Sequence, residues 1–210
     1  MMARLMIADD HQLFREGLRR LLPSDEFEVV ADVGSGRDAI REARRHEPDL
    51  ALLDVSMPGL NGVDTAREVM RVSPRTRVVV LTMHRDDPYI VEALRAGARG
   101  YVLKTQSVTE LLAALRDVAL GGVYVPQQYW RAVVESQQNS HEPSVDPLTP
   151  REREVLQLVA EGRTTKEIGA TLNISFKTAE SHRLRTMSKL GIHETASLVR
   201  YVIRRHMIEP

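Results

Sequence analysis

The chain of 210 residues contains no cysteine. This absence excludes disulfide bonds, thiolate catalysis and metal sites with cysteine ligands. The N-terminus has no apolar signal region, and no apolar run approaches the roughly 20 residues that a membrane span requires. The sequence therefore predicts a soluble, cytoplasmic protein that does not bind a membrane. Its length suits one or two domains, each large enough to bury a core.

The chain also lacks a net charge, because 29 Lys and Arg balance 29 Asp and Glu. The balance is uneven along the sequence. Residues 148–210 carry 11 basic and 7 acidic side chains, whereas residues 1–147 carry 18 basic and 22 acidic ones. This asymmetry predicts a polyanion-binding surface that is confined to the C-terminal part.

Polar side chains follow four short apolar runs, which lie at residues 4–8, 50–53, 78–81 and 101–103. Such runs are typical of parallel strands that are buried on both faces, and they indicate an α/β fold. The side chains at their ends are Asp9 and Asp10, Asp54, Thr82 and Lys104. In such sheets the ligand lies outside the carboxyl ends of the strands, so we expect these side chains to meet at one edge.

These residue types predict a particular chemistry. Several carboxylates without a neutralising partner repel one another, and a divalent cation such as Mg²⁺ removes that repulsion. Asp10 and Asp54 would be direct Mg²⁺ ligands, and Asp9 would bind through water. Lys104 and the Thr82 hydroxyl suit phosphoryl oxygens. The sequence thus predicts a site that places a phosphoryl group on Asp54, the nucleophile.

The pattern resembles the receiver domain of two-component response regulators. The matching segments are Asp9-Asp10-His11, Asp54 with Met57-Pro58-Gly59, Thr82, and Gly100 to Lys104. The resemblance implies a flavodoxin-like, doubly wound sheet of five parallel strands over residues 1–122, and phosphorylation of Asp54 by a sensor histidine kinase. It also implies that the Ser56 carbonyl binds Mg²⁺ and that Thr82 and Tyr101 form a switch pair. Ser56 and His84 occupy positions that tune the phosphoryl lifetime in this family.

Several of these residues also have other interpretations. Asp9 or Asp10 could cap a helix from Gln12 to Leu22, and Asp54 could be an ordinary loop carboxylate. Many receivers have proline after the active-site lysine, where this chain has Thr105, so the geometry of that peptide bond is left open. Residues 34–39 fit a G-x-G-x-x-A dinucleotide pattern, but it follows the second strand rather than the first. Ser35 as a helix cap explains it better.

The sequence predicts a linker at residues 123–147. A helix from about Ser107 to Leu120 is followed by Gly121-Gly122, a typical stop signal. Residues 137–147 are polar and contain two prolines, as in a linker. Between these segments, residues 127–136 could form a short helix that docks on one of the domains through Trp130 and Val133-Val134, with Trp130 as a packing anchor.

Residues 148–210 predict a small all-α domain. Thr149, Pro150 and Glu152 are typical of a capped helix start, and Gly162 ends this helix. Residues 164–167 form a second capping signal, and a longer basic helix runs from about residue 176 to 190. A short helix, a tight turn and a longer helix make a helix-turn-helix, whose second helix enters the DNA major groove.

The segments at residues 148–156, 166–168, 175–182 and 189–191 resemble the LuxR-type DNA-binding domain. With the receiver in front, the whole chain resembles a NarL/FixJ-type response regulator. Most basic residues of the long helix would contact phosphates, and Glu180 would accept from a cytosine amino group. His182 would position the helix or touch a phosphate. The predicted DNA-contacting residues are Lys177, Thr178, Glu180, Ser181, His182, Arg183, Leu184, Arg185 and Lys189.

The resemblance also implies a homodimer that reads two half-sites of double-stranded DNA. The last helix, about residues 194–206, would carry the dimer contact and complete the core through Ala196, Val199, Val202 and Ile203. Alternatively, every apolar residue of this helix is internal.

The function predicted from these features is a transcription regulator controlled by phosphorylation, and not an enzyme. A regulator that works without phosphorylation is the alternative. A phosphatase or phosphotransferase with an aspartyl nucleophile is a weaker one, because such enzymes place a second aspartate two residues on, where this chain has Ser56.

Overall fold

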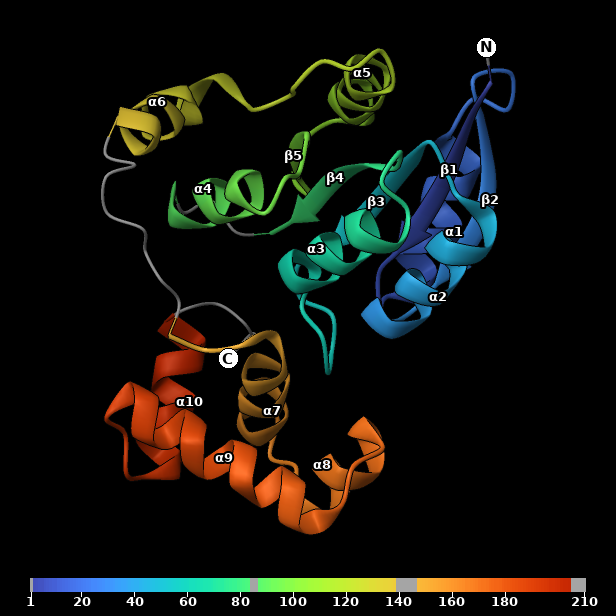
Figure 1. Ribbon diagram of the computed structural model, residues 1–210. Coiled ribbons are helices and arrows are strands. Elements are labelled where there is room, and N and C mark those ends of the chain that lie inside the picture. Colours follow the sequence, from blue (N-terminus) through green and yellow to red (C-terminus); the bar gives the residue numbers. More distant parts are fainter. Residues whose placement is uncertain (1, 84–86, 139–146, 205–210) are drawn as a thin grey trace. The chain divides into compact units, whose positions relative to one another are not determined.

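A computed structural model describes residues 2–83, 87–138 and 147–204 of the chain (Figure 1). The chain divides into two compact units, an N-terminal α/β unit and a C-terminal all-α unit. In the described part of the chain, no helix combines the length and the apolar character needed to cross a bilayer.

The N-terminal unit is built on five parallel strands, as the family resemblance implied, and their order is β2-β1-β3-β4-β5. The strands are β1 (Ala3–Ala8), β2 (Phe27–Val33), β3 (Leu50–Asp54), β4 (Arg77–Thr82) and β5 (Gly100–Leu103). The three inner strands β1, β3 and β4 are apolar on both faces, because helices cover the two sides of the sheet.

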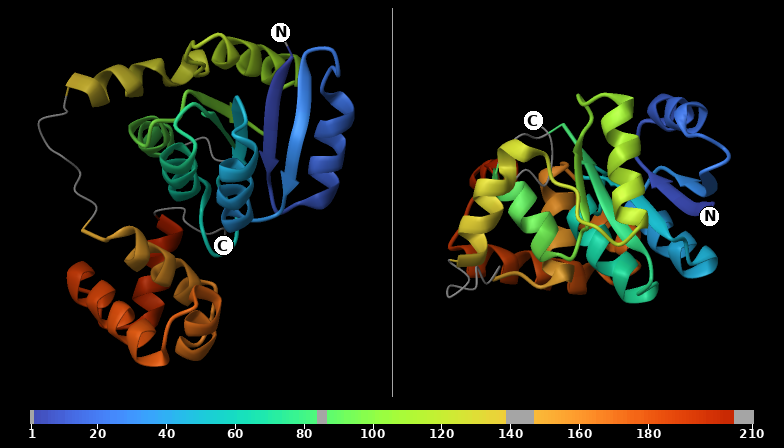
Figure 2. Two further views of the ribbon diagram at one scale, coloured as in Figure 1. Left: turned by 45° about the vertical axis from the view of Figure 1, so that its right-hand side comes forward. Right: turned by 90° about the horizontal axis from the view of Figure 1, so that it is seen from above.

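Successive side chains of each strand enter different cores. The helices that cover the two faces of the sheet can be followed in Figure 2. Leu52 of β3 packs with residues of α1 (Gln12–Leu21) and α5 (Val108–Ala119). Its neighbour Leu53 packs on the other face with residues of α2 (Gly36–His46), α3 (Gly62–Val72) and α4 (Asp87–Arg95). The alternation follows from the two-residue period of a strand.

The helix caps follow the sequence signals. Ser35 accepts a hydrogen bond from the Asp38 backbone N–H at the start of α2, which confirms the capping interpretation of the glycine motif. Ser107 and Glu110 form a reciprocal capping box at the start of α5, where the sequence predicted a helix. Helix α1, by contrast, has His11 as its N-cap residue, so the interpretation of Asp9 or Asp10 as its cap is wrong.

The C-terminal unit consists of four helices among its described residues. They are α7 (Pro150–Ala160), α8 (Thr165–Leu172), α9 (Phe176–Leu190) and α10 (Thr195–Arg204). The predicted capping boxes of Thr149 with Glu152 and of Thr164 with Glu167 are both present. Asn173, in the left-handed region, makes the turn between α8 and α9, and Gly191 ends α9 in the same conformation. The predicted helix-turn-helix is therefore confirmed.

The beginning of the predicted linker packs on the N-terminal unit. Residues 127–129 form the 3₁₀ turn η1 (Gln127–Tyr129), and α6 (Trp130–Gln138) follows it and lies against α4. Tyr129 and Val133, one helical turn apart, enter the core with Val125. The prediction that Trp130 anchors this helix is wrong, because its side chain is 44 % exposed whereas those of Tyr129 and Val133 are buried. Residues 139–146 of the predicted linker lie outside the described residues.

Candidate functional site

The predicted cluster of charged residues exists at the carboxyl edge of the sheet. Asp9 follows β1, Asp54 is the last residue of β3, and Lys104 follows β5. The Lys104 Nζ atom lies 2.8 Å from Asp9 Oδ2 and 3.1 Å from Asp54 Oδ2. The three residues are separated by as much as 95 positions in sequence, and the fold brings them together because the parallel strands β1, β3 and β5 end at the same edge of the sheet.

The charged groups of this cluster are largely withdrawn from water. Asp9 is 1 % exposed and Asp54 is 2 % exposed. Burial is the main reason that the pKa of Asp54 rises to about 6, and the neighbouring Asp9 charge raises it further. Lys104 and the backbone N–H of Ser56 act in the opposite direction. Asp54 is therefore mainly a carboxylate at neutral pH, as a nucleophile must be.

The neighbouring carboxylates stabilise the protonated form of Lys104. Burial lowers its pKa, but the Asp54 and Asp9 carboxylates outweigh this effect and leave the pKa above its ordinary value. Its Nζ atom also lies 5.0 Å from the centre of the Phe14 ring, a cation–π distance. The Lys104 backbone N–H donates to the Thr82 carbonyl, with a distance of 2.7 Å between N and O. Thr82 itself is fully buried at the end of β4.

The carboxylates of this edge could hold a divalent cation. One ligand atom from each of Asp9, Asp10, His11 and Asp54 can be chosen so that all lie within 4.8 Å of one another. Apart from the Lys104 ammonium, the buried Asp9 Oδ2 and Asp54 Oδ2 atoms have no hydrogen-bond donor among the described residues. Carboxylate oxygens with unused lone pairs fit a hard ion such as Mg²⁺. Ser56, whose carbonyl was predicted as a further ligand, is half-buried beside them.

His11 belongs to this cluster, although sequence reasoning did not assign it a role. Its Nδ1 atom lies 2.9 Å from Asp10 Oδ1 and 3.2 Å from Asp9 Oδ1, and the ring is 65 % exposed. The Asp9 carboxylate also accepts the His11 backbone N–H, at 2.9 Å. The available signal was its position directly after the two aspartates in the sequence.

Gly62 is a second residue that sequence reasoning missed. It opens α3 directly behind Asp54, and its backbone N–H donates to the Val55 carbonyl at 2.8 Å. A Cβ atom at this position would lie 2.1 Å from the Asp54 carbonyl oxygen, so no larger residue fits without a backbone shift. The only local signal was the Asn61-Gly62 pair.

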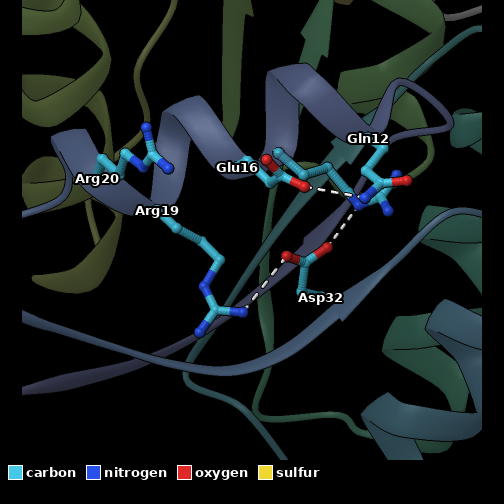
Figure 3. Close-up of a pocket in the computed structure, with 6 residues that line it drawn as sticks. Gln12, Glu16, Arg19, Arg20 and Asp32 are labelled. Carbon is cyan, nitrogen blue, oxygen red and sulfur yellow. Dashed lines mark hydrogen bonds and ion pairs between the residues drawn. The ribbon is translucent and has the colours of Figure 1, made fainter.

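Charged residues of α1 and β2 line a cleft of about 480 Å³ beside the acidic cluster (Figure 3). Arg15 Nη1 donates to the Asp9 carbonyl at 2.6 Å, and its Nε lies 2.5 Å from an Asp32 carboxylate oxygen. Arg19 contacts the other Asp32 oxygen at 3.6 Å, as the dashed line in Figure 3 marks. This network fixes the backbone that carries the two aspartates.

The predicted switch residue Tyr101 points into the protein. Its side chain is fully buried in the core between β5 and α4. The ring of Tyr129 meets it edge to face, with centroids 6.3 Å apart and an interplanar angle of 73°. No peptide bond in residues 2–83, 87–138 and 147–204 is cis, so the bond between Lys104 and Thr105 is trans. His84 lies outside the described residues.

Helix α9 presents a continuous exposed stripe. Lys177, Ser181, Leu184 and Ser188 follow the helical spacing i, i+4, i+7 and i+11, and all except the half-buried Ser181 are exposed. The predicted contacts Thr178, Glu180 and Arg185 are exposed beside it, whereas His182 and Arg183 are half-buried. Ser188 and the 55 % exposed Phe176 were absent from the predicted set. Ala179 and Thr186 are buried and so define the inner face of α9. Given that face, the helical period places Phe176 and Ser188 on the exposed side.

Two of the predicted DNA contacts, Lys189 and Arg183, are partly engaged within the C-terminal unit. Lys189 Nζ lies 2.7 Å from Oε2 of the buried Glu152, so its charge neutralises a carboxylate of α7. Arg183 donates to the Thr195 hydroxyl at 3.0 Å. The Nδ1 atom of His182 is buried and has no partner among the described residues. The interactions of Lys189 and Arg183 favour a role for these two side chains within the C-terminal unit.

The last helix divides its predicted dimer residues between core and surface. Val202 is fully buried with Leu198 in the core of the C-terminal unit, so Val202 cannot contact a second chain in this conformation. Its position places it on the inner face of the helix. Ala196 is exposed, and Val199 and Ile203 are half-buried. Of the four residues predicted for the dimer contact, Ala196, Val199 and Ile203 are thus at least partly accessible within the described part of α10.

Comparison with known protein families gives the same division of the chain. The family described as response regulator receiver domain matches residues 5–116, and the luxR family of bacterial regulatory proteins matches residues 146–202. A receiver domain joined to a LuxR-type helix-turn-helix defines a two-component response regulator that regulates transcription.

Curated relatives share this architecture over nearly their whole length. The transcriptional regulatory protein DegU of Brevibacillus brevis is 37 % identical over 93 % of this chain and 91 % of its own. The oxygen regulatory protein NreC of Staphylococcus aureus is 36 % identical over 98 % of this chain and 99 % of its own. The chain belongs to the NarL/FixJ-type response regulators. DegU is described as a transcriptional regulatory protein and NreC as an oxygen regulatory protein.

Solved structures agree with this assignment. RcsB from Salmonella enterica serovar Typhimurium, bound to a promoter in the presence of the phosphomimetic BeF3⁻, superposes with a TM-score of 0.62. The two sequences are 28 % identical, and the match covers 96 % of this chain and 98 % of that one. An RcsB–DNA complex matches with a TM-score of 0.59 and 29 % identity over 97 % of this chain and 98 % of that one.

Proposed function

We propose that this regulator is switched by phosphorylation of Asp54. The observation that carries the proposal is the pair of contacts from Lys104 to the buried Asp9 and Asp54 carboxylates. A sensor histidine kinase supplies the phosphoryl group from a phosphohistidine. An Asp54 oxygen attacks phosphorus, the P–N bond breaks, and the freed imidazole takes up a proton.

The residues around Asp54 have distinct tasks in this step. Lys104 compensates negative charge on a phosphoryl oxygen, and the Thr82 hydroxyl donates to another. Asp9, Asp10, Asp54 and the Ser56 carbonyl would hold Mg²⁺, which supplies the positive charge that offsets the crowded carboxylates and the phosphoryl group. Because these groups position and stabilise rather than turn over a substrate, we class the protein as a regulator and not as an enzyme.

The output of the switch is DNA binding by α9. We propose that its exposed stripe enters the major groove, with Lys177 and Arg185 at phosphates and Glu180, Ser181 and Leu184 at base edges. Phosphorylation would favour a homodimer that reads two half-sites, with a contact through Ala196, Val199 and Ile203 of α10. The RcsB–DNA complex and the structure of RcsB dimers bound to DNA support this assembly by similarity.

A single experiment tests input and output together. The purified full-length chain is incubated with Mg²⁺ and acetyl phosphate, and phosphorylation is measured by phosphate-affinity electrophoresis. Genomic footprinting and light scattering then measure DNA occupancy and oligomeric state. We expect treatment with acetyl phosphate to raise dimerisation and DNA occupancy of the natural chain. The same treatment should change neither quantity in Asp54→Asn. Equal occupancy in both proteins would support a regulator that works without phosphorylation.

A further inference from the structure

Residues 123–133, here called the return segment, run from the end of α5 back across β5. The Tyr101 backbone N–H donates to the Tyr124 carbonyl at 2.9 Å, and the Tyr124 N–H donates to the Arg99 carbonyl at 2.9 Å. Gly100 and Tyr124 form a parallel bridge. The return segment therefore pairs with the exposed edge of β5, the strand that carries Tyr101.

Side chains of the return segment complete the core around Tyr101. Tyr129 is 4 % exposed and Val133 is 7 % exposed, and both pack in the same core as Tyr101 and Ile90 of α4. Tyr101 is fully buried, with the Tyr129 ring against it at 6.3 Å between centroids. Tyr101 cannot change its position without moving Tyr129 or losing this contact.

Two features weaken the packing of the return segment on the N-terminal unit. The Tyr129 hydroxyl is buried without a hydrogen-bond partner among the described residues, which is unfavourable in an apolar core. A cleft of about 600 Å³ lies between α4 and the return segment, with Val91 and Leu94 on one side and Val123 and Trp130 on the other. Both features lower the cost of a displaced position of the segment in which the hydroxyl would meet water.

We infer that Tyr129 is the positioning residue that couples the Tyr101 switch to the chain leading out of the receiver. This inference rests on the proposed phosphorylation of Asp54. The return segment is docked when the two rings are in contact, and a change in the Tyr101 environment on phosphorylation releases or re-seats it. The signal thereby reaches α6 through one edge-to-face ring contact and the β5 edge.

The chain contains a natural reporter for this coupling. Trp130 is its only tryptophan, follows Tyr129 directly and lines the cleft at the return segment. Tryptophan emission of the full-length protein is measured before and after addition of Mg²⁺ and BeF3⁻. We expect a shift of the emission maximum in the natural chain and none in Asp54→Asn.

Substitutions at Tyr129 distinguish coupling from a merely structural role. We expect Tyr129→Ala to lose the emission shift while it accepts the phosphoryl group from acetyl phosphate as well as the natural chain. Tyr129→Phe, which keeps the ring and removes the unpaired hydroxyl, retains the shift. Val134→Ala is the matched control, because Val134 lies on the same helix and is 47 % exposed. A full shift in Tyr129→Ala would overturn the inference.

Hydrogen exchange of the natural chain gives a test that needs no variant. The Tyr101 and Tyr124 amides bond across the β5 edge, so their exchange rates change with BeF3⁻ if the return segment moves. A phosphorylated protein with unchanged emission and unchanged exchange at these amides disproves the coupling alone. Absence of phosphoryl transfer to the natural chain would instead disprove the proposed function, and the coupling with it.

Discussion

The Lys189 ammonium group lies 2.7 Å from a carboxylate oxygen of Glu152 and thereby joins α9 to α7. Glu152 is the third residue of α7, completes the capping box with Thr149 and is 4 % exposed, so this pair links the DNA-binding helix to the capped start of α7. The same lysine was expected to contact DNA phosphates. In this structure the Lys189 ammonium group instead forms an ion pair within the C-terminal unit.

Replacing Lys189 should therefore act on stability before it acts on DNA contacts. We expect Lys189→Ala to lower the unfolding free energy of the C-terminal unit by about 1 kcal/mol, because the lysine is partly exposed and the charged hydrogen bond is screened. Chemical denaturation monitored by circular dichroism measures this change. Lys166→Ala removes an exposed lysine of the same unit and should be nearly neutral. Equal stability of the two variants would contradict the structural role.

The Glu152 pair also predicts a pH dependence. Burial raises the pKa of Glu152, but Lys189 and the Thr149 cap outweigh this and hold the pKa below its ordinary value. A lowered folded-state pKa contributes stability above the unfolded pKa of about 4.3. We expect the stability of the C-terminal unit to fall as pH decreases below that value. The pH dependence of its denaturation midpoint should be weaker in Lys189→Ala.

Asp54 should titrate far from an ordinary aspartate. In the metal-free protein we expect its carboxyl group to lose its proton with a pKa of about 6, mainly because it is buried. Lys104→Met should raise this pKa further, since the ammonium group lowers it. Carbon-detected NMR titration of the aspartate carboxyls measures both values. A midpoint near 4 in the natural chain would show that water reaches the site more freely than the structure implies.

Gly62 should tolerate no side chain. Gly62→Ala places a Cβ atom against the Asp54 backbone, and we expect it to destabilise the N-terminal unit by about 3 kcal/mol. Gly17→Ala is the matched control, because its added Cβ meets no atom within 4 Å and it lies inside helix α1. That substitution should stabilise by about 0.5 to 1 kcal/mol. Thermal denaturation compares the two, and similar midpoints would refute the packing argument.

The exposed stripe of α9 predicts how DNA is read. Lys177→Ala and Arg185→Ala should each weaken binding to all sequences. Each should also reduce the slope of the logarithm of the binding constant against the logarithm of the salt concentration by about one. Affinity measured by fluorescence anisotropy at several salt concentrations tests this. A loss of affinity without a change in salt dependence would argue against phosphate contacts at these two side chains.

Base readout should depend on the middle of the stripe. Glu180→Ala should alter base preference at one position, because a carboxylate accepts from a cytosine amino group. Leu184 is 63 % exposed, and an apolar side chain there suits a thymine methyl group. We expect replacement of the contacted thymine by uracil to weaken DNA binding by the natural chain and to leave DNA binding by Leu184→Ala unchanged. Binding selection with random DNA measures the first change, and losses at every position would exclude a specific contact by Glu180.

Much of this architecture was predictable from local pattern. The strand runs, Ser35, Thr149 and Thr164 each specify nearby backbone, and all three caps formed as predicted. Tyr129 and Trp130 show where local pattern ends. Both are large aromatic residues in one short helical stretch, and only the face that meets α4 decides which is buried. Gly62 is similar, since the need for glycine arises from a strand end eight residues earlier in the chain.

By itself, the sequence determined the two-part organisation, the family, the order of strands and helices, and the residue types at the carboxyl edge. These properties depend on short-range periodicity and on motifs with fixed spacing. Only the tertiary structure decided that Lys104 forms ion pairs with both Asp9 and Asp54, that Lys189 pairs with Glu152, and that Val202 is buried in the core. Such relationships depend on which residues the packed elements bring within a few ångströms, and sequence spacing does not specify that distance.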